Sequence, residues 1–165
     1  MVRDFPQDPL GYVFQGLEFY LMRNCDKTKE AMQKAIELGV RDPRAYHTMA
    51  LCLEDWPQAK MYFEKNINEY PTYGLSYIGL GRGYLLQEGN SDAALEYLLR
   101  GNELLRSYSS FAYLIQIFLM KGKEQDAMAI LQEARLSIRG PQMLQSLENF
   151  FDKTKVVKLP IDIGI

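Results

Sequence analysis

The stretch Tyr77-x2-Leu80-Gly81-x2-Tyr84, followed by Ala94-x3-Leu98, decides the fold. The same order of large, small and aromatic residues returns as Phe111-x2-Leu114-Ile115-x2-Phe118, followed by Ala127-x3-Leu131. A pattern that recurs at a short, fixed spacing indicates that one supersecondary unit is stacked on similar units, because a single unit does not bury its apolar face alone. The sequence therefore predicts an all-α helical repeat protein.

Apolar residues at helical spacing continue in both directions from this stretch, and proline and glycine interrupt them at hairpin-length intervals. Pro9 and Pro43 each follow an aspartate, as expected in the first turn of a helix. The pattern predicts a lead-in at 1–9 and four helical hairpins, which span about 10–39, 43–69, 73–105 and 107–138. Glycines are expected as left-handed caps at the helix ends, at positions Gly39, Gly89, Gly122 and Gly140.

A last helix is expected over about 141–153, which closes a repeat domain of residues 10–153. The segment 154–165 is rich in β-branched residues and contains Pro160, so it is predicted to be an extended apolar tail. Such a tail is expected to dock, either on the chain's own helices or on a partner, because its apolar side chains would otherwise stay in water.

The hairpin pattern resembles the tetratricopeptide repeat (TPR), a helix-turn-helix unit of roughly 34 residues. The third hairpin matches it through Tyr77, Leu80, Gly81, Tyr84 and Ala94, and the fourth replaces the glycine by Ile115. The resemblance covers residues 9–139 and implies a right-handed superhelix of about four TPR-like hairpins with a capping helix. Small residues such as Gly81 and Ala94 would let the two helix axes of a hairpin approach closely.

The first two hairpins depart from this pattern. The second has a shorter first helix or a tighter turn around Trp56, because Leu53 and Ala59 are closer in sequence than Tyr84 and Ala94. Trp56 is predicted to be buried or half-buried, with a capping aspartate before it and a first-turn proline after it. In the first hairpin two registers stay open, one with Tyr12, Gly16 and Phe19 and one with Phe14, Leu17 and Leu21 facing inward.

The resemblance also implies where a partner would bind, because in TPR proteins the first helices line a concave groove. Groove positions lie one and five residues after the first large aromatic of each first helix, with two more a turn further along. The implied partner groove is mainly apolar with one cation, and consists of His47, Leu51, Ile78, Arg82, Leu85, Ala112, Gln116 and Met120. The isolated cation Arg82 does not form the basic cluster with which some co-chaperones hold a C-terminal carboxylate.

Composition excludes several other functions. The formal charge is −2 and no Lys/Arg run occurs, which argues against nucleic acid, since phosphate binding needs a positive face. A single histidine, His47, rules out a multi-histidine metal cluster and leaves little basis for an enzyme, so no cofactor or metal is expected. Two cysteines are too few for a disulfide framework, and Cys52 is expected to be a small buried residue, with Cys25 near a turn.

No apolar run has the length needed to span a membrane, and the first residues lack the apolar segment of a signal peptide. A cytoplasmic location is therefore expected. The leading hypothesis is a non-catalytic adaptor that binds a protein or peptide in the groove. The alternative is a self-assembling repeat protein, joined through the apolar residues Phe150 and Phe151 and the tail.

Overall fold

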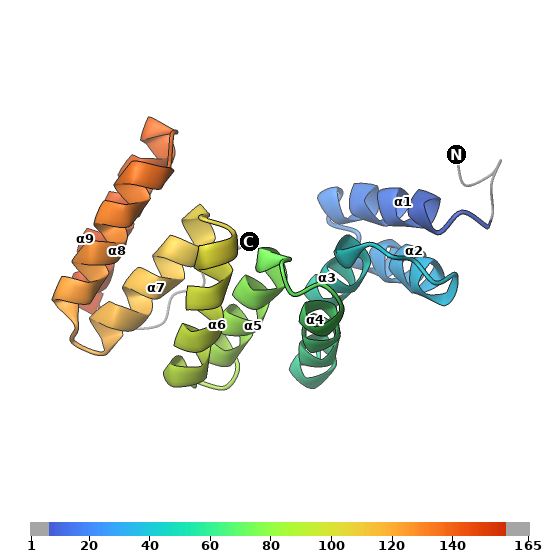
Figure 1. The fold of residues 1–165 in the computed structure, drawn as a ribbon, viewed down its shortest axis with the longest axis horizontal. Helices are drawn as coiled ribbons and strands as arrows, with labels where there is room; N and C mark the ends of the chain where they lie inside the picture. The colour runs from blue at the N-terminus through green and yellow to red at the C-terminus, as the bar shows by residue number, and fades with distance from the viewer. Residues whose placement is uncertain (1–6, 158–165) are drawn as a thin grey trace. The chain divides into compact units, whose positions relative to one another are not determined.

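The computed structural model describes residues 7–157, and within that part of the chain it contains nine α-helices and no strand (Figure 1). The all-α prediction is therefore confirmed. The chain divides into two compact units, Met1–Ser76 and Tyr77–Ile165. The helices are α1 Pro9–Leu21, α2 Cys25–Glu37, α3 Pro43–Leu51, α4 Trp56–Glu69, α5 Gly74–Leu86, α6 Ser91–Leu104, α7 Tyr108–Met120, α8 Glu124–Ser137 and α9 Pro141–Val157.

Short polar side chains begin most of these helices, as the sequence indicated. The Asp8 carboxylate accepts a hydrogen bond from the Leu10 amide at 3.0 Å, and that of Asp42 accepts one from the Arg44 amide at 2.9 Å. The Asp55 carboxylate accepts from the Gln58 amide at 3.1 Å and so caps α4, which begins at the half-buried Trp56. Each cap satisfies a backbone donor that the helix leaves unpaired.

Helix ends agree with the sequence less closely. Gly39, Gly89 and Gly122 have φ values of 73°, 63° and 72°, so they are left-handed caps as predicted. Gly140 is not a left-handed cap, although one was predicted there; it directly precedes α9. Helix α3 ends at Leu51, which gives the second hairpin the shortened first helix that its spacing required.

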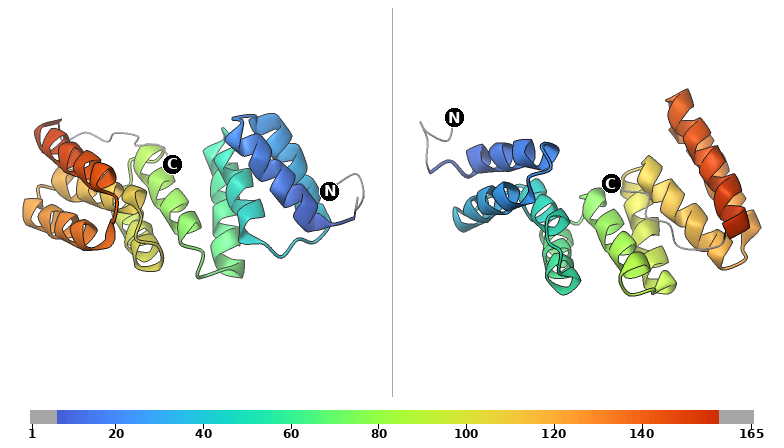
Figure 2. Two further views of the ribbon diagram at one scale, coloured as in Figure 1. Left: turned by 90° about the horizontal axis from the view of Figure 1, so that it is seen from above. Right: turned by 180° about the vertical axis from the view of Figure 1, so that it is seen from behind.

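In unit 1, α1 and α2 form one antiparallel hairpin and α3 and α4 the next (Figure 2). A small core, cluster A, joins α1, α2 and α3; its buried members are Val13, Met32, Ala35, Val40, Ala45 and Met49. Gly16 is buried where its backbone lies against Met32, and a Cβ at this position would come within 2.7 Å of the Met32 Cε. Phe14 and Leu21 are exposed, whereas Leu17 packs against cluster A together with Tyr12. The structure therefore favours the register of Tyr12, Gly16 and Phe19, with Leu17 of the other register also facing inward.

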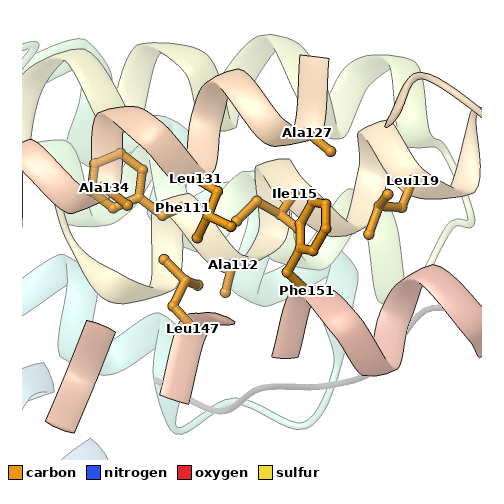
Figure 3. Close-up of a cluster of buried hydrophobic side chains, with 9 residues drawn as sticks. All are labelled: Phe111, Ala112, Ile115, Leu119, Ala127, Leu131, Ala134, Leu147 and Phe151. Atoms are coloured by element: carbon orange, nitrogen blue, oxygen red, sulfur yellow. The ribbon is translucent and has the colours of Figure 1, made fainter. Parts of the chain in front are cut away.

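In unit 2, α7, α8 and α9 pack together around a second core (Figure 3). The buried members of this cluster B are Phe111, Ala112, Ile115, Leu119, Ala127, Leu131, Ala134, Leu147 and Phe151. Leu147 and Phe151 come from α9, so the predicted capping helix covers the fourth hairpin. Phe150 is half-buried against the same core. Phe151 is therefore an internal core residue and does not form the outward self-assembly surface that the sequence suggested.

Helix α9 is longer than predicted, since it continues through residues 154–157, which were expected to be extended. The buried side chain of Thr154 and a 2.5 Å ion pair between Lys155 Nζ and Glu124 Oε1 hold this last turn against the start of α8. These tertiary contacts outweigh the low helix propensity of the β-branched residues. The expected docking of residues 158–165 lies outside the described residues.

The two cysteines also differ from expectation, because they are joined by a disulfide. Cys25 is the first residue of α2, and Cys52 is the C-cap residue that directly follows α3. Their Cα atoms are 5.1 Å apart, a usual separation for a bridge. Cys52 is buried as predicted, but its sequence neighbourhood gave no sign of a partner 27 residues away.

Gly81 sits at the closest approach of α5 and α6, which confirms the role proposed for its small size. A Cβ at this position would collide with the Leu98 Cγ and lie 3.0 Å from the Ala94 carbonyl oxygen. We expect Gly81→Ala to destabilise unit 2 by about 1–2 kcal/mol despite the better helix propensity of alanine.

Urea unfolding followed by circular dichroism would measure this cost. The double variant Gly81→Ala with Leu98→Ala serves as the control, because removing the Leu98 side chain removes the collision. The loss of unfolding free energy in the double variant should be smaller than the sum of the losses in the two single variants. Additive costs would show that α5 and α6 are not in contact at Gly81.

Candidate interaction surface

The predicted groove residues of unit 1 lie on α3. His47 is buried and Leu51 is half-buried at the last turn of the helix. Residues 45–50 of α3 are all buried, so neighbouring structure surrounds most of this helix. Leu51 is therefore the only one of the two predicted residues whose side chain is open to a partner.

The predicted groove residues of unit 2 lie on α5 and α7, and most of them are part of the core. Ile78 and Leu85 are buried in a third cluster, cluster C, whose members are Ile78, Leu85, Ala94, Leu98, Tyr113, Leu114 and Ile117. Ala112 belongs to cluster B, and Gln116 is buried as well. Arg82 is half-buried on α5, and Met120 is half-buried where it packs against cluster C. The accessible part of the predicted face in unit 2 thus consists of Arg82 and Met120.

A further accessible apolar surface lies on α1 and was not among the predicted groove residues. Leu10, Phe14 and Leu21 are 44%, 52% and 82% exposed, respectively. Their spacing of four and then seven residues places them on one side of the helix. We call this set the α1 stripe. The sequence fitted two registers of α1. Which side of this helix faces outward therefore became clear only from the packing of Gly16 against α2.

A buried polar network joins α3, α4 and the start of α5 within unit 1. The Asn66 Nδ2 donates to the Pro43 carbonyl oxygen at 2.9 Å and to the Ser76 Oγ at 2.7 Å. The Ser76 Oγ lies 3.2 Å from the His47 Nδ1, and the His47 ring packs against Phe63 and Tyr73 with centroid separations of 5.5 Å. Burial lowers the pKa of His47 to about 4, because the apolar surroundings disfavour the charged ring. His47 is thus a neutral structural residue at pH 7.

We therefore expect acid to destabilise unit 1 through His47. Its pKa is about 4 when folded and 6.5 in its unperturbed state, so the unfolded chain binds the extra proton between these values. Stability is complete above pH 6.5 and falls as the pH approaches 4; at pH 4.5 the loss should be about 2.5 kcal/mol. Urea unfolding at pH 7 and at pH 4.5, followed by the fluorescence of Trp56, measures this loss of stability.

The control variant for this experiment is His47→Gln, which has no group that titrates in this range. Its unfolding free energy should change less between pH 7 and 4.5 than that of the unmodified protein. Equal changes in the two proteins would show that His47 is not buried as a neutral ring.

An asparagine–serine hydrogen bond recurs in unit 2 and was missed by the sequence reasoning. The Ser110 Oγ donates to the Asn102 Oδ1 at 2.8 Å, and the Asn102 Nδ2 donates to Glu133 Oε1 at 3.3 Å. Asn66 and Asn102 both lie near the end of a second helix, and each contacts a serine near the start of the next first helix. The sequence signal that could have indicated these hydrogen bonds is an asparagine followed by a serine, ten residues later in unit 1 and eight residues later in unit 2.

The described residues bring no three His, Cys, Asp or Glu side chains together as a metal site would require. Among them, no helix combines the length and apolar character needed to cross a bilayer. Two shallow pockets of unit 2 involve α9. One is lined by Leu119, Gly122, Glu124 and Lys155, near the C-terminal end of α9, and the other by Tyr108 and by Ser146, Asn149, Phe150 and Lys153 along the middle of the helix.

No protein-family model and no curated protein matches the sequence. Solved structures do match. TTC0263, a thermophilic TPR protein of Thermus thermophilus, is 16% identical with a TM-score of 0.75, over 94% of this chain and 85% of that one. PilF of Pseudomonas aeruginosa is 17% identical with a TM-score of 0.70, over 93% of this chain and 78% of PilF. MamA is 14% identical with a TM-score of 0.66, over 92% of this chain and 83% of MamA. The helical hairpins, the close approach at Gly81 and these matches together show that this chain has the fold of a tetratricopeptide-repeat protein.

Proposed function

We propose that this chain is a non-catalytic scaffold that binds a protein or peptide through side chains of its first helices. The observation that carries the proposal is the accessible apolar surface on these helices, foremost the α1 stripe. Leu51 on α3 and Met120 on α7 add apolar contacts, and Arg82 on α5 adds one charge. Apolar anchors supply most of the binding energy of such surfaces, while polar groups fix the register of the partner.

The burial of the other predicted groove residues gives them a supporting role in this proposal. His47, Ile78, Leu85, Ala112 and Gln116 are buried, so they hold the first helices in place. Catalysis is disfavoured because the only histidine is buried with a lowered pKa. A partner with an apolar face fits the accessible side chains of the α1 stripe, Leu51 and Met120.

Charge substitution on the first helices tests the proposal. We expect Leu51→Glu, Arg82→Glu and Met120→Glu together to weaken partner binding by about tenfold or more, since buried charges at a contact surface cost over 1 kcal/mol each. A second variant with Leu10→Glu, Phe14→Glu and Leu21→Glu tests the α1 stripe separately. Binding is measured as retention of a partner that co-purifies with the unmodified protein.

The matched control is a triple variant on the second helices, with Leu99→Glu, Met128→Glu and Leu136→Glu. These side chains are exposed on α6 and α8 as those of the α1 stripe are on α1, so the control adds charges at a folding cost similar to that of the α1 variant. It should bind as the unmodified protein does. If this control loses the partner while both first-helix variants keep it, the first helices are not the contact surface.

A further inference from the structure

The Cys25–Cys52 bridge connects two hairpins of unit 1 that are also joined through the apolar side chains of cluster A. Cys25 begins the second helix of the first hairpin, and Cys52 directly follows the first helix of the second hairpin. They are the only cysteines of the chain, so neither has another partner within it. The bridge therefore fixes the start of α2 to the end of α3.

The contacts beside the bridge are those of a small apolar core. Two of the six buried members of cluster A, Ala35 and Ala45, are alanines, and further apolar side chains, Leu17 and Leu53 among them, pack against the cluster. Outside the core, the Arg44 guanidinium lies 5.1 Å from the centre of the Phe14 ring and is held there by its bidentate pairing with Asp42. Such partly exposed pairs contribute little. The bridge thus adds a covalent link, between the start of α2 and the residue after α3, to the apolar contacts of cluster A.

The two sulfur atoms differ in their surroundings. Cys25 is half-buried at the first position of α2, where unpaired backbone amides stabilise a thiolate. Cys52 is 4% exposed. An external thiolate therefore reaches the bridge from the side of Cys25, and Cys25 is the better stabilised of the two as a thiolate.

We propose that the Cys25–Cys52 bridge is a thiol–disulfide exchange site at which a dithiol reductant releases the first hairpin from the second. One thiolate of the dithiol attacks the Cys25 sulfur, which forms a mixed disulfide and releases Cys52, and Cys52 takes up a proton. The second thiol of the reductant then loses its proton to solvent and attacks the reductant's own sulfur in the mixed disulfide, which expels the Cys25 thiolate and leaves the reductant oxidised by two electrons. Oxidation of the two cysteines by a disulfide of the same class reverses both steps.

This inference rests on the proposed scaffold function for its consequence. The first hairpin carries the α1 stripe, and Cys52 directly follows Leu51, which lies on the second hairpin. The bridge keeps these two contact surfaces at a fixed distance. Reduction removes that constraint, so a partner that touches both surfaces is bound less tightly by the reduced protein.

The test uses the full chain without any partner, so its failure is distinct from a failure of the scaffold proposal. The folded protein is equilibrated with defined ratios of reduced and oxidised glutathione, and free thiols are trapped by alkylation and counted by mass. We expect the bridge to titrate between these ratios in native buffer. Amide exchange over residues 9–37 should then be roughly a hundredfold faster in the reduced form, while exchange over residues 108–151 stays unchanged.

The double variant Cys25→Ser with Cys52→Ser is the control for reduction, and it should reproduce the fast exchange over 9–37 in the absence of reductant. Reoxidation of the unmodified protein should restore the slow exchange. The proposal is overturned if the bridge resists excess dithiothreitol until denaturant is added, if the thiols never pair, or if the reduced hairpin exchanges as slowly as the oxidised one.

Discussion

Replacing Phe111 by alanine should lower the unfolding free energy of unit 2 by about 3–5 kcal/mol. The Phe111 side chain is fully buried in cluster B, where α7, α8 and α9 meet (Figure 3). Its removal leaves a cavity between three helices that are held in place by the other buried members of cluster B, among them Leu131 and Leu147. The surrounding side chains therefore have little room to collapse into the space.

Urea unfolding followed by circular dichroism measures this loss. The matched control is Phe14→Ala, because Phe14 is the same residue type at an exposed position on α1. The control should cost less than about 1 kcal/mol, which is the scale of its contact with Arg44. Similar costs for the two variants would contradict the placement of Phe111 at the centre of the α7–α9 packing.

Removing the Cys25–Cys52 bridge should lower the unfolding free energy of unit 1 by about 3.5 kcal/mol. The bridge closes a loop between residues 27 positions apart, and the loop-closure entropy of the unfolded chain then gives this magnitude. The measurement is urea unfolding of Cys25→Ser with Cys52→Ser, followed by the fluorescence of Trp56. This tryptophan is the only one in the chain and lies in unit 1, so it reports on the unit that contains the bridge.

The unmodified protein in excess dithiothreitol provides the control for this prediction. Complete reduction should bring its urea midpoint to that of the double variant. A double variant as stable as the oxidised protein would mean that the bridge does not constrain the unfolded chain.

The sequence predicted the hairpins because their packing residues have fixed spacing. Gly81 opposite Leu98 and Ala94 is a local requirement of a close helix pair, and it repeats in recognisable form. The tight second turn could also be predicted, since Asp55 and Pro57 flank the start of α4. The length of α9 could not, because its last turn is stabilised by contacts with α8 that lie far away in the sequence.

The disulfide and the accessible surface were harder to predict for the same physical reason. Whether Cys25 meets Cys52 depends on how one hairpin packs on the next, and spacing within a helix does not contain that information. The positions of Ile78 and Gln116 within their first helices likewise predicted which face of the helix they lie on. They did not predict whether that face is exposed or buried, and both residues are buried. Only the packing of the neighbouring helices separates these buried residues from the accessible Arg82 and Met120.

Contact between the first helices and a partner is tested most directly by site-specific photocrosslinking in the native cell. A photoreactive amino acid is placed at Leu51 or Met120 on the first helices, and at Met128 or Leu136 on α8 as the control. We predict a discrete crosslinked protein from positions 51 and 120 and none from 128 and 136. Crosslinks confined to 128 and 136, or none at any of the four positions, would contradict the proposed scaffold function.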